Sequence, residues 1–171
     1  RCSSGRQCGN RRMKVLVTGS AGFIGFHTAK RFLEAGHNVV GYDGFTRYYD
    51  LQLKRARNEI LRTYAAFTAV EGMLEDQGLL TATVEDHHPE LVVHLAAQAG
   101  VRHSIENPAA YISSNIQGTF NLLEALRHCM PRHLLFASTS SVYGGNTEFP
   151  FEETARTAFP LSLYAATKSS G

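Results

Sequence analysis

The sequence lacks several features that mark other classes of protein. It has no run of about 18 apolar residues, so we expect no membrane span. Its net charge is only +2, which gives no reason to expect nucleic-acid binding. Its 3 cysteines are scattered and odd in number, which favours a reducing compartment over a disulfide framework. Cys2 and Cys8 lack the further ligands of a zinc site. We therefore expect a cytoplasmic protein without a metal.

The composition is that of a folded domain with a basic end. Hydrophobic residues make up 43% of the 171 residues and charged residues 19%. Four arginines fall within the first 12 residues, which also lack the apolar segment of a signal peptide. We expect residues 1–12 to be a disordered basic tail, with Met13 as the native start. Residues 13–171 then form the folded domain.

A glycine-rich stretch follows a short apolar run near the N-terminus. Val15–Val17 is typical of a strand buried on both faces, and Gly19, Gly22 and Gly25 follow at G-x-x-G-x-x-G spacing. In a dinucleotide site the first glycine permits the tight turn. The second lets a pyrophosphate approach the backbone, and the third lets helix and strand pack closely. Free N–H groups at the helix start would face the phosphate. The same triplet also fits a strand-turn-helix without a ligand.

An acidic residue at the end of the next predicted strand supports the dinucleotide interpretation. Asp43 ends the apolar stretch from Asn38 and lies 24 residues beyond Gly19. The fingerprint places a carboxylate about 20 residues on, at the end of the second strand. This carboxylate would accept from the adenosine ribose hydroxyls. It would repel a 2′-phosphate and therefore favours NAD over NADP. The alternative is a turn-forming aspartate before Gly44.

Strand and helix patterns alternate along the chain. We predict strands at 15–17, 38–43, 66–70, 90–96 and 133–138, and helices at 23–35, 51–64, 78–84, 108–129 and from 162 onward. The alternation predicts an α/β fold, the Rossmann doubly wound parallel sheet with right-handed crossovers. Helix 51–64 is expected to have a solvated basic face made by Lys54, Arg55, Arg57 and Arg62.

Two groups of residues late in the chain suggest chemistry. Tyr164 and Lys168 lie one helical turn apart on one face. A nearby lysine cation lowers the pKa of a tyrosine, which can then take a proton from a sugar hydroxyl while hydride leaves for a nicotinamide. The hydroxyl cluster Ser138–Ser141 ends the fifth strand, where it could bond the reacting oxygen. The alternatives are a chance spacing and a plain Ser/Thr-rich turn.

Four motifs together resemble the extended short-chain dehydrogenase/reductases. They are Thr18–Gly25, His94–Arg102, Ser138–Gly144 and Tyr164–Lys168. Within that group the chain is most similar to nucleotide-sugar epimerases of the UDP-glucuronate 4-epimerase type. Further similarities to that type lie in Tyr48-Tyr49-Asp50, Leu53–Arg57 and Ala99–Ser104. The resemblance covers residues 14–169.

The resemblance implies an NAD-dependent enzyme that epimerises a UDP-sugar at C4 through a 4-keto intermediate. It assigns catalysis to Thr139, Tyr164 and Lys168. It assigns cofactor binding to Gly19, Gly22, Phe23, Ile24, Gly25, Asp43, Leu74, Ala96, Ala97, Gln98, Asn115, Ser138, Tyr164 and Lys168. It also implies a nucleotide-sugar substrate. Family members commonly dimerise through the helix after Asn107 and the one containing Tyr164, which implies a homodimer of the full-length form.

Two departures from the family pattern keep alternatives open. Met73 stands where the family usually has an aspartate that contacts adenine. Such enzymes are also about twice as long, so we expect this chain to be truncated before the C-terminal substrate domain. A dehydratase or dehydrogenase of the same superfamily and an inactive NAD-binding fragment remain alternative functions. Ser140 and Ser141 argue against the dehydratase, which carries an Asp-Glu pair there.

Overall fold

The computed structural model describes residues 11–147 and 149–171. Its strands are β1 (Lys14–Thr18), β2 (Asn38–Asp43), β3 (Phe67–Glu71), β4 (Leu91–His94) and β5 (His133–Phe136). Its α-helices are α1 (Phe23–Glu34), α2 (Leu51–Arg62), α3 (Gln77–His87), α4 (Val101–Glu106), α5 (Pro108–Tyr111), α6 (Gly118–His128) and α7 (Leu163–Ser169). A π-helical segment, η1 (Ile112–Gln117), joins α5 to α6, and a 3₁₀ turn, η2 (Ser140–Tyr143), follows β5.

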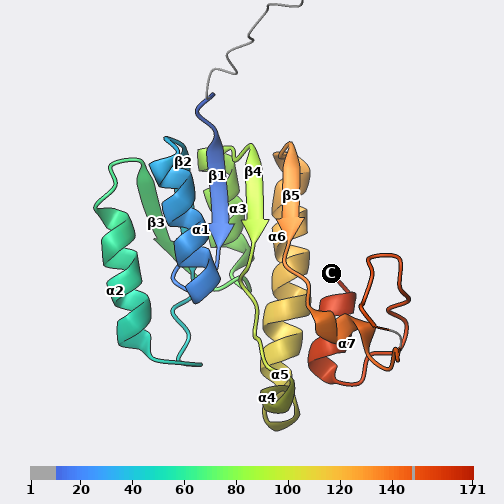
Figure 1. The fold of residues 1–171 in the computed structure, drawn as a ribbon. Coiled ribbons are helices and arrows are strands. Elements are labelled where there is room, and N and C mark those ends of the chain that lie inside the picture. Colours follow the sequence, from blue (N-terminus) through green and yellow to red (C-terminus); the bar gives the residue numbers. More distant parts are fainter. Residues whose placement is uncertain (1–10, 148) are drawn as a thin grey trace, which may run out of the picture.

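The five strands form one parallel sheet in the order β3-β2-β1-β4-β5 (Figure 1). The chain winds outward from β1 to β3 and then returns to place β4 on the other side of β1. This confirms the predicted doubly wound parallel sheet. The reversal lies between β1 and β4, and in such sheets ligands bind at the carboxyl ends beside the reversal.

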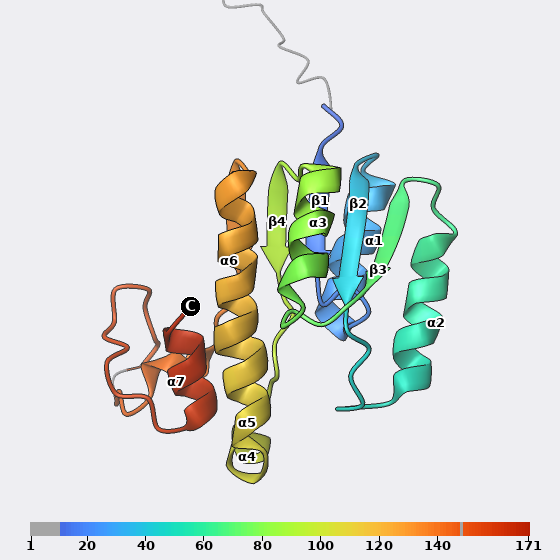
Figure 2. The same ribbon diagram turned by 180° about the vertical axis from the view of Figure 1, so that it is seen from behind.

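Each face of the sheet has its own apolar core. Helices α1 and α2 cover one face, and α3 and α6 cover the other (Figures 1 and 2). Val15 and Val17 pack with Phe26 of α1, whereas Leu16 packs with Leu122 of α6. Successive residues of a strand face opposite sides, so a strand between two helical layers must be apolar throughout. This explains the unbroken run at 15–17.

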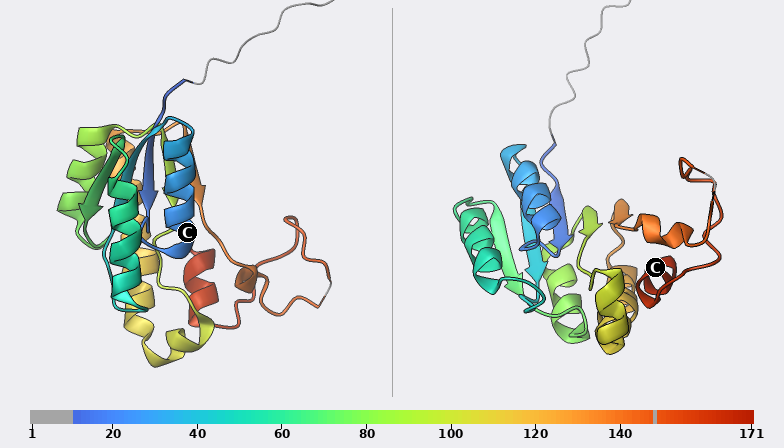
Figure 3. Two further views of the ribbon diagram at one scale, coloured as in Figure 1. Left: turned by 60° about the vertical axis from the view of Figure 1, so that its left-hand side comes forward. Right: turned by 60° about the horizontal axis from the view of Figure 1, so that its bottom comes forward.

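Helices α4, α5 and α7 lie beyond the carboxyl ends of the strands (Figures 1 and 3). Strand β5 forms one edge of the sheet, and Leu135 in it is 54% exposed. None of the helices in the described part of the chain is long and apolar enough to cross a membrane.

Several boundaries differ from the predicted ones. The sequence pattern missed α4 and η2, because elements of six and four residues are too short to show a period. The predicted helix 108–129 is divided into α5, η1 and α6, and α3 extends to His87 rather than residue 84. The predictions for residues 1–10, including Cys2 and Cys8, lie outside the described residues.

Candidate functional site

A groove opens at the carboxyl ends of β1, β2 and β4. Seven of the residues predicted to bind the cofactor line it: Gly19, Gly22, Asp43, Leu74, Ala96, Ala97 and Gln98. It is also lined by residues that were not predicted to bind the cofactor: Tyr48, Tyr49, Lys54 and Met73, which the sequence analysis noted for other reasons, and Glu75 and Ser114, which it did not note. The other predicted residues are not among those that line it.

The glycine turn brings the start of α1 close to β1 and β4. Gly19 has φ +72°, and its N–H donates to Tyr42 O at 2.7 Å. A Cβ on Gly19 would lie 2.8 Å from Ala96 N, and one on Gly25 would overlap Gly19 O. Gly22 is the N-cap of α1, and no side chain caps this end. The first N–H groups of α1 are therefore available to an anion.

Asp43 joins the end of β2 to this turn. Its carboxylate is buried and accepts from Ala21 N at 3.0 Å through Oδ2 and from Phe45 N at 2.8 Å through Oδ1. The bond to Phe45 is the local turn contact that the alternative interpretation described. The bond to Ala21 fixes the carboxylate beside the glycine turn. A carboxylate has about four acceptor positions, so it can still accept from a ribose hydroxyl.

The predicted solvated basic face of α2 is wrong for Lys54. This residue is 6% exposed, and its Nζ donates to Thr46 O at 3.0 Å and to Thr46 Oγ1 at 3.1 Å. The ammonium also lies 4.8 Å from the centre of the Tyr49 ring. Burial lowers the pKa of Lys54, and the charge of Asp43 opposes this.

The orientation of α2 explains this error. The helix buries Lys54, Asn58 and Leu61, whereas Leu53 is 45% exposed. The long apolar stem of a lysine can cover the core while its charge stays among polar atoms. The residues Tyr48-Tyr49-Asp50 carried part of the family resemblance. That motif, together with the similarity at Leu53–Arg57, was the sequence signal that could have placed this segment at the groove.

Asn115 joins the segment after β4 to α7. It is 3% exposed, accepts from Gln98 N at 2.7 Å, and donates to Gln98 O at 3.0 Å and to Thr167 Oγ1 at 3.0 Å. Its amide is therefore engaged by the protein rather than exposed in the groove. One buried side chain thus fixes both a wall of the groove and the helix that carries Tyr164 and Lys168.

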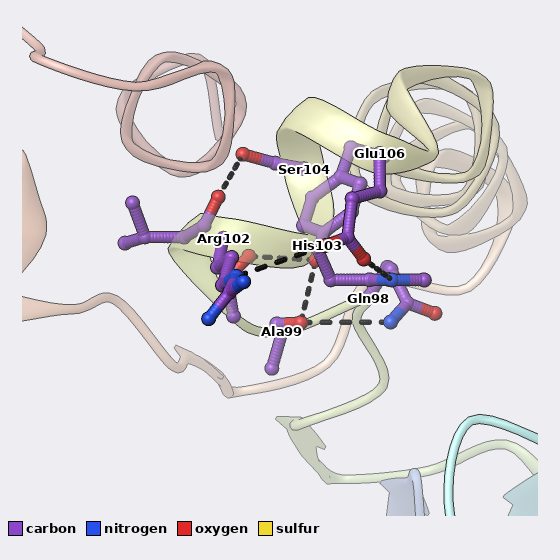
Figure 4. Close-up of polar contacts among 9 residues, drawn as sticks. Gln98, Ala99, Arg102, His103, Ser104 and Glu106 are labelled. Atoms are coloured by element: carbon purple, nitrogen blue, oxygen red, sulfur yellow. Dashed lines mark hydrogen bonds and ion pairs between the residues drawn. The ribbon is translucent and has the colours of Figure 1, made fainter.

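The segment that follows Gln98 turns back on itself through short polar contacts (Figure 4). The Tyr111 hydroxyl lies 2.6 Å from both Ala99 O and Gly100 O, and Ser104 Oγ donates to Val101 O at 2.6 Å. The ring of His103 packs on Tyr48 with centroids 5.2 Å apart. Through His103, α4 therefore contacts Tyr48, which lines the groove.

Tyr164 and Lys168 lie on α7, which begins as predicted at Ser162. The Ser162 side chain accepts from Ala165 N at 3.1 Å. Lys168 is 6% exposed, and its Nζ lies 4.3 Å from the centre of the Phe136 ring. Burial lowers the pKa of Lys168. The Tyr164 ring packs edge-on against Tyr111, with centroids 6.0 Å apart.

The remaining predicted residues are Thr139, Ser138, Phe23 and Ile24. Thr139 caps η2, accepting from Ser141 N at 3.2 Å and donating to Ser141 Oγ at 3.3 Å. Turn η2 packs against α7, although Thr139 and Tyr164 make no hydrogen bond to each other. Ser138 is exposed, and Phe23 and Ile24 are 65% and 64% exposed on α1.

Curated relatives match this sequence closely over about half of their own length or less. A "Probable UDP-glucuronate 4-epimerase" from Rhizobium meliloti (strain 1021) is 53% identical over 158 residues, which are 92% of this chain and 46% of that protein. UDP-glucuronate 4-epimerase 3 from Arabidopsis thaliana is 48% identical over 170 residues, 99% of this chain and 39% of that protein. The chain therefore spans about half the length of the curated relatives it matches, or less.

A solved structure shows the same architecture. The UDP-glucuronic acid 4-epimerase from Bacillus cereus, in complex with UDP-glucuronic acid and NAD, superposes with a TM-score of 0.84 at 36% identity. The match covers 92% of this chain and 49% of that one. The model of the NAD dependent epimerase/dehydratase family matches residues 15–171. The chain belongs to the NAD dependent epimerase/dehydratase family.

Proposed function

We propose that the full-length protein carrying this sequence is an NAD-dependent UDP-glucuronate 4-epimerase. The observation that carries the proposal is the position of Asn115. It holds Gln98, in the wall of the groove, and Thr167, on the helix of Tyr164 and Lys168, through one buried amide. A dinucleotide in the groove and an acid–base pair beside it are the two parts that reversible oxidation at a sugar carbon needs. The relatives named above supply the substrate class.

The residues of the groove fit NAD. The uncapped N-terminus of α1, with Gly19 and Gly22 beneath it, suits the pyrophosphate. Asp43 retains acceptor positions for ribose hydroxyls, and a carboxylate there disfavours the 2′-phosphate of NADP. Leu74 and Met73 offer an apolar surface beside Gly72 for the adenine. We keep Phe23, Ile24, Gly25 and Ser138 in the proposed set as residues that shape this site rather than line it.

The proposed chemistry uses residues on α7 and after β5. Bound NAD would supply a reversible acceptor for hydride from C4 of the sugar. Tyr164 takes the proton of the C4 hydroxyl, and Thr139 bonds the same oxygen. Lys168, buried beside Phe136 on the helix that carries Tyr164, provides positive charge near the phenolate. Ser140 and Ser141 offer no carboxylic acid for the elimination of water, so epimerisation is favoured over dehydration.

We also propose a homodimer of the full-length protein. The outer face of η1 and α6 exposes Ile112, Ile116, Phe120 and Leu123 at 46%, 38%, 53% and 43%. No other element covers the outer side of α6 in Figure 2. A stripe of this length suits a second copy of the same helix. A cytoplasmic location, supported by the scattered cysteines, completes the proposal.

Turnover of the full-length protein tests the reaction. Incubation with NAD and UDP-glucuronate should yield UDP-galacturonate, identified by NMR of the sugar anomeric protons. The Tyr164→Phe variant should lose turnover by a factor of 100 or more and should bind NAD nearly as well as the wild type. Wild-type protein that binds NAD and forms no product would refute the epimerase. Equal losses of turnover and NAD affinity would refute the role of Tyr164.

The 171-residue chain by itself has a narrower proposed activity. We propose that it binds NAD weakly and does not turn over substrate, since the relatives extend to about twice its length. Calorimetric titration of NAD into this chain checks the affinity. Micromolar binding would contradict the weak affinity, and product formation would contradict the absence of turnover.

A further inference from the structure

His94, the last residue of β4, is buried beside the groove and has no part in the proposed function so far. It is 2% exposed and pairs with Thr18 across the β1–β4 ladder. Its Nδ1 lies 2.7 Å from Thr18 Oγ1, and its Nε2 lies 3.2 Å from Thr119 Oγ1 on α6. The imidazole therefore joins the sheet to α6 at the carboxyl ends of β1 and β4.

The hydrogen bonds of Thr18 determine which nitrogen of His94 carries the proton. Thr18 Oγ1 accepts from Ala96 N at 3.1 Å and from Leu95 N at 3.2 Å; the Leu95 N–H is shared with the Thr18 carbonyl oxygen, also at 3.2 Å. A hydroxyl has two lone pairs and one hydrogen, so its own hydrogen remains for His94. Nδ1 must then be the acceptor. The neutral ring carries its proton on Nε2 and donates to Thr119 Oγ1.

We propose that His94 is a positioning residue for the cofactor site, held as the neutral Nε2–H tautomer, and that it acts through the Thr18 hydroxyl on the backbone of Ala96. This inference rests on the proposed function, because it takes NAD as the ligand of the groove. The hydroxyl of Thr18 is oriented by His94 so that both its lone pairs face the segment after β4.

The orientation of the Thr18 hydroxyl matters because the segment Ala96–Gln98 packs closely against the glycine turn. The backbone of Gly19 lies close to that of Ala96, since a Cβ on Gly19 would lie 2.8 Å from Ala96 N. Asn115 fixes Gln98 at the other end of the same short segment. Ala96–Gln98 is therefore held at both ends, by Thr18 and by Asn115. Loss of either hold would let this wall of the groove move.

The surroundings keep the imidazole neutral. Phe136 packs on one side of the His94 ring, with centroids 5.6 Å apart, and the ammonium of Lys168 on α7 lies over that same phenyl ring. Burial, and secondarily the charge of Lys168, lower the pKa of His94 to about 4. An imidazolium would also direct an Nδ1–H at the Thr18 hydroxyl, whose lone pairs are already engaged.

Nitrogen NMR of the chain labelled with ¹⁵N-histidine tests the tautomer directly. We expect the His94 signals at pH 7 to show a protonated Nε2 and an unprotonated Nδ1, unchanged down to pH 5.5. A protonated Nδ1, or titration of His94 between pH 6 and pH 7, would overturn the proposal. This measurement needs neither NAD nor turnover.

Two amide variants separate positioning from simple core packing. His94→Asn can place an acceptor where Nδ1 stands and keep the bond to Thr18. His94→Gln reaches the position of Nε2 and keeps the bond to Thr119. Both lose the ring, so thermal unfolding should report similar losses of stability. Calorimetric titration of NAD into the full-length protein should show affinity at least tenfold weaker in His94→Gln than in His94→Asn.

Substitutions at Thr18 provide the matched pair. Thr18→Val should reproduce the tenfold loss of NAD affinity, and Thr18→Ser, which keeps the hydroxyl, should retain most of the affinity. Equal NAD affinities in the two His94 variants, or wild-type affinity in Thr18→Val, would overturn the proposal. If the wild-type protein binds no NAD, the proposed function fails. Hydrogen exchange then tests the positioning role of His94 without NAD. The proposal requires that the Ala96 N–H exchange faster in His94→Gln than in His94→Asn.

Discussion

The carboxylate of Asp43 and the N–H of Ala21 form a hydrogen bond of 3.0 Å across 22 residues of sequence. This bond ties the carboxyl end of β2 to the glycine turn after β1. It brings the acceptor proposed for ribose next to the N–H groups proposed for pyrophosphate. The glycine turn and the acidic residue of the dinucleotide fingerprint are thus joined by a hydrogen bond of the protein itself.

Replacing Asp43 by asparagine should weaken NAD binding. Asparagine has one acceptor oxygen for the two N–H groups of Ala21 and Phe45 and offers no charge to a ribose hydroxyl. Hydrogen bonds to a charged group contribute about 1.5–3 kcal/mol, so NAD affinity should fall about 10-fold to 100-fold in the full-length protein. Calorimetric titration measures this, with the exposed Glu85→Gln as the control.

The same variant should also lose part of its preference for NAD over NADP, because the charge that repels a 2′-phosphate is gone. This ratio does not depend on the fraction of protein that is folded. Unchanged affinity for NAD together with an unchanged ratio would show that Asp43 only forms the turn to Phe45.

Replacing Asn115 by leucine should destabilise the fold and separate α7 from the groove. The side chain makes three hydrogen bonds, and a similar-sized apolar group leaves Gln98 N, Gln98 O and Thr167 Oγ1 without this partner. Each buried polar group left unpaired costs about 1–3 kcal/mol. Urea unfolding of the 171-residue chain should show a loss of at least about 2 kcal/mol.

The buried Asn121 is the matched control for this substitution. Its amide donates to Leu74 O and Glu75 O, away from Gln98 and α7. Asn121→Leu should also destabilise the chain. Only Asn115→Leu should accelerate hydrogen exchange of the α7 amides relative to the rest of the protein. The same exchange pattern in both variants would contradict a specific link from Asn115 to α7.

Replacing Gly25 by alanine should destabilise the chain although alanine favours helices. Helix propensity alone would stabilise the alanine variant by about 1 kcal/mol. A Cβ at this position, however, overlaps the carbonyl oxygen of Gly19, which is backbone and cannot rotate away. Overpacking of this kind costs about 1–3 kcal/mol or more, so the overlap outweighs the propensity.

Urea unfolding should therefore show a loss of about 1 kcal/mol or more for Gly25→Ala. Gly145→Ala is the control, because no atom of the residues that the structure describes lies within 4 Å of the added Cβ. It should change stability by no more than about 0.5 kcal/mol. A Gly25→Ala variant as stable as the wild type would mean that α1 does not approach the turn this closely.

Replacing Leu135 by lysine should reduce aggregation of the 171-residue chain. The leucine is 54% exposed on the edge strand β5, and charged residues on edge strands hinder pairing with another chain. Light scattering at equal concentration measures the effect. Thr68→Lys adds the same charge on β3, at the opposite edge, without removing apolar surface. Equal improvement in both variants would assign the effect to net charge rather than to the β5 edge.

The low pKa of His94 predicts acid sensitivity. In the folded protein it is lowered from 6.5 to about 4, so between these values the unfolded chain binds more protons than the folded one. Stability must therefore fall as the pH falls from 6.5 to 4. The full difference corresponds to about 3 kcal/mol.

Urea unfolding of the wild type at pH 7 and at pH 4.5 should show this loss on top of that from other groups. The His94→Gln variant, which has no titrating group at this position, should lose less stability over the same interval. Parallel curves for the two proteins would mean that His94 is not held neutral by burial.

The sequence by itself determined the sheet and its ligand-binding end. A strand covered on both faces has to be apolar throughout, and a turn that meets another backbone has to be glycine, so Val15–Val17 and Gly19–Gly25 were readable without coordinates. The position of Asp43 could also be predicted, because its place at the end of a strand follows from chain order. These features depend on residues that are close together in the chain, so the sequence pattern shows them.

Tertiary structure decided what depends on residues far apart in the chain. The sequence pattern placed Lys54 in water, and the fold buries it against Thr46 and Tyr49 because α2 turns a different face to the sheet. The tautomer of His94 follows from its partners Thr18 on β1 and Thr119 on α6 and from the N–H of Ala96 after β4, which a periodicity in the sequence cannot bring together. Asn115 likewise gains its role only when Gln98 and Thr167 meet. Hydrogen bonds across the core are directional, so only the folded chain assigns them.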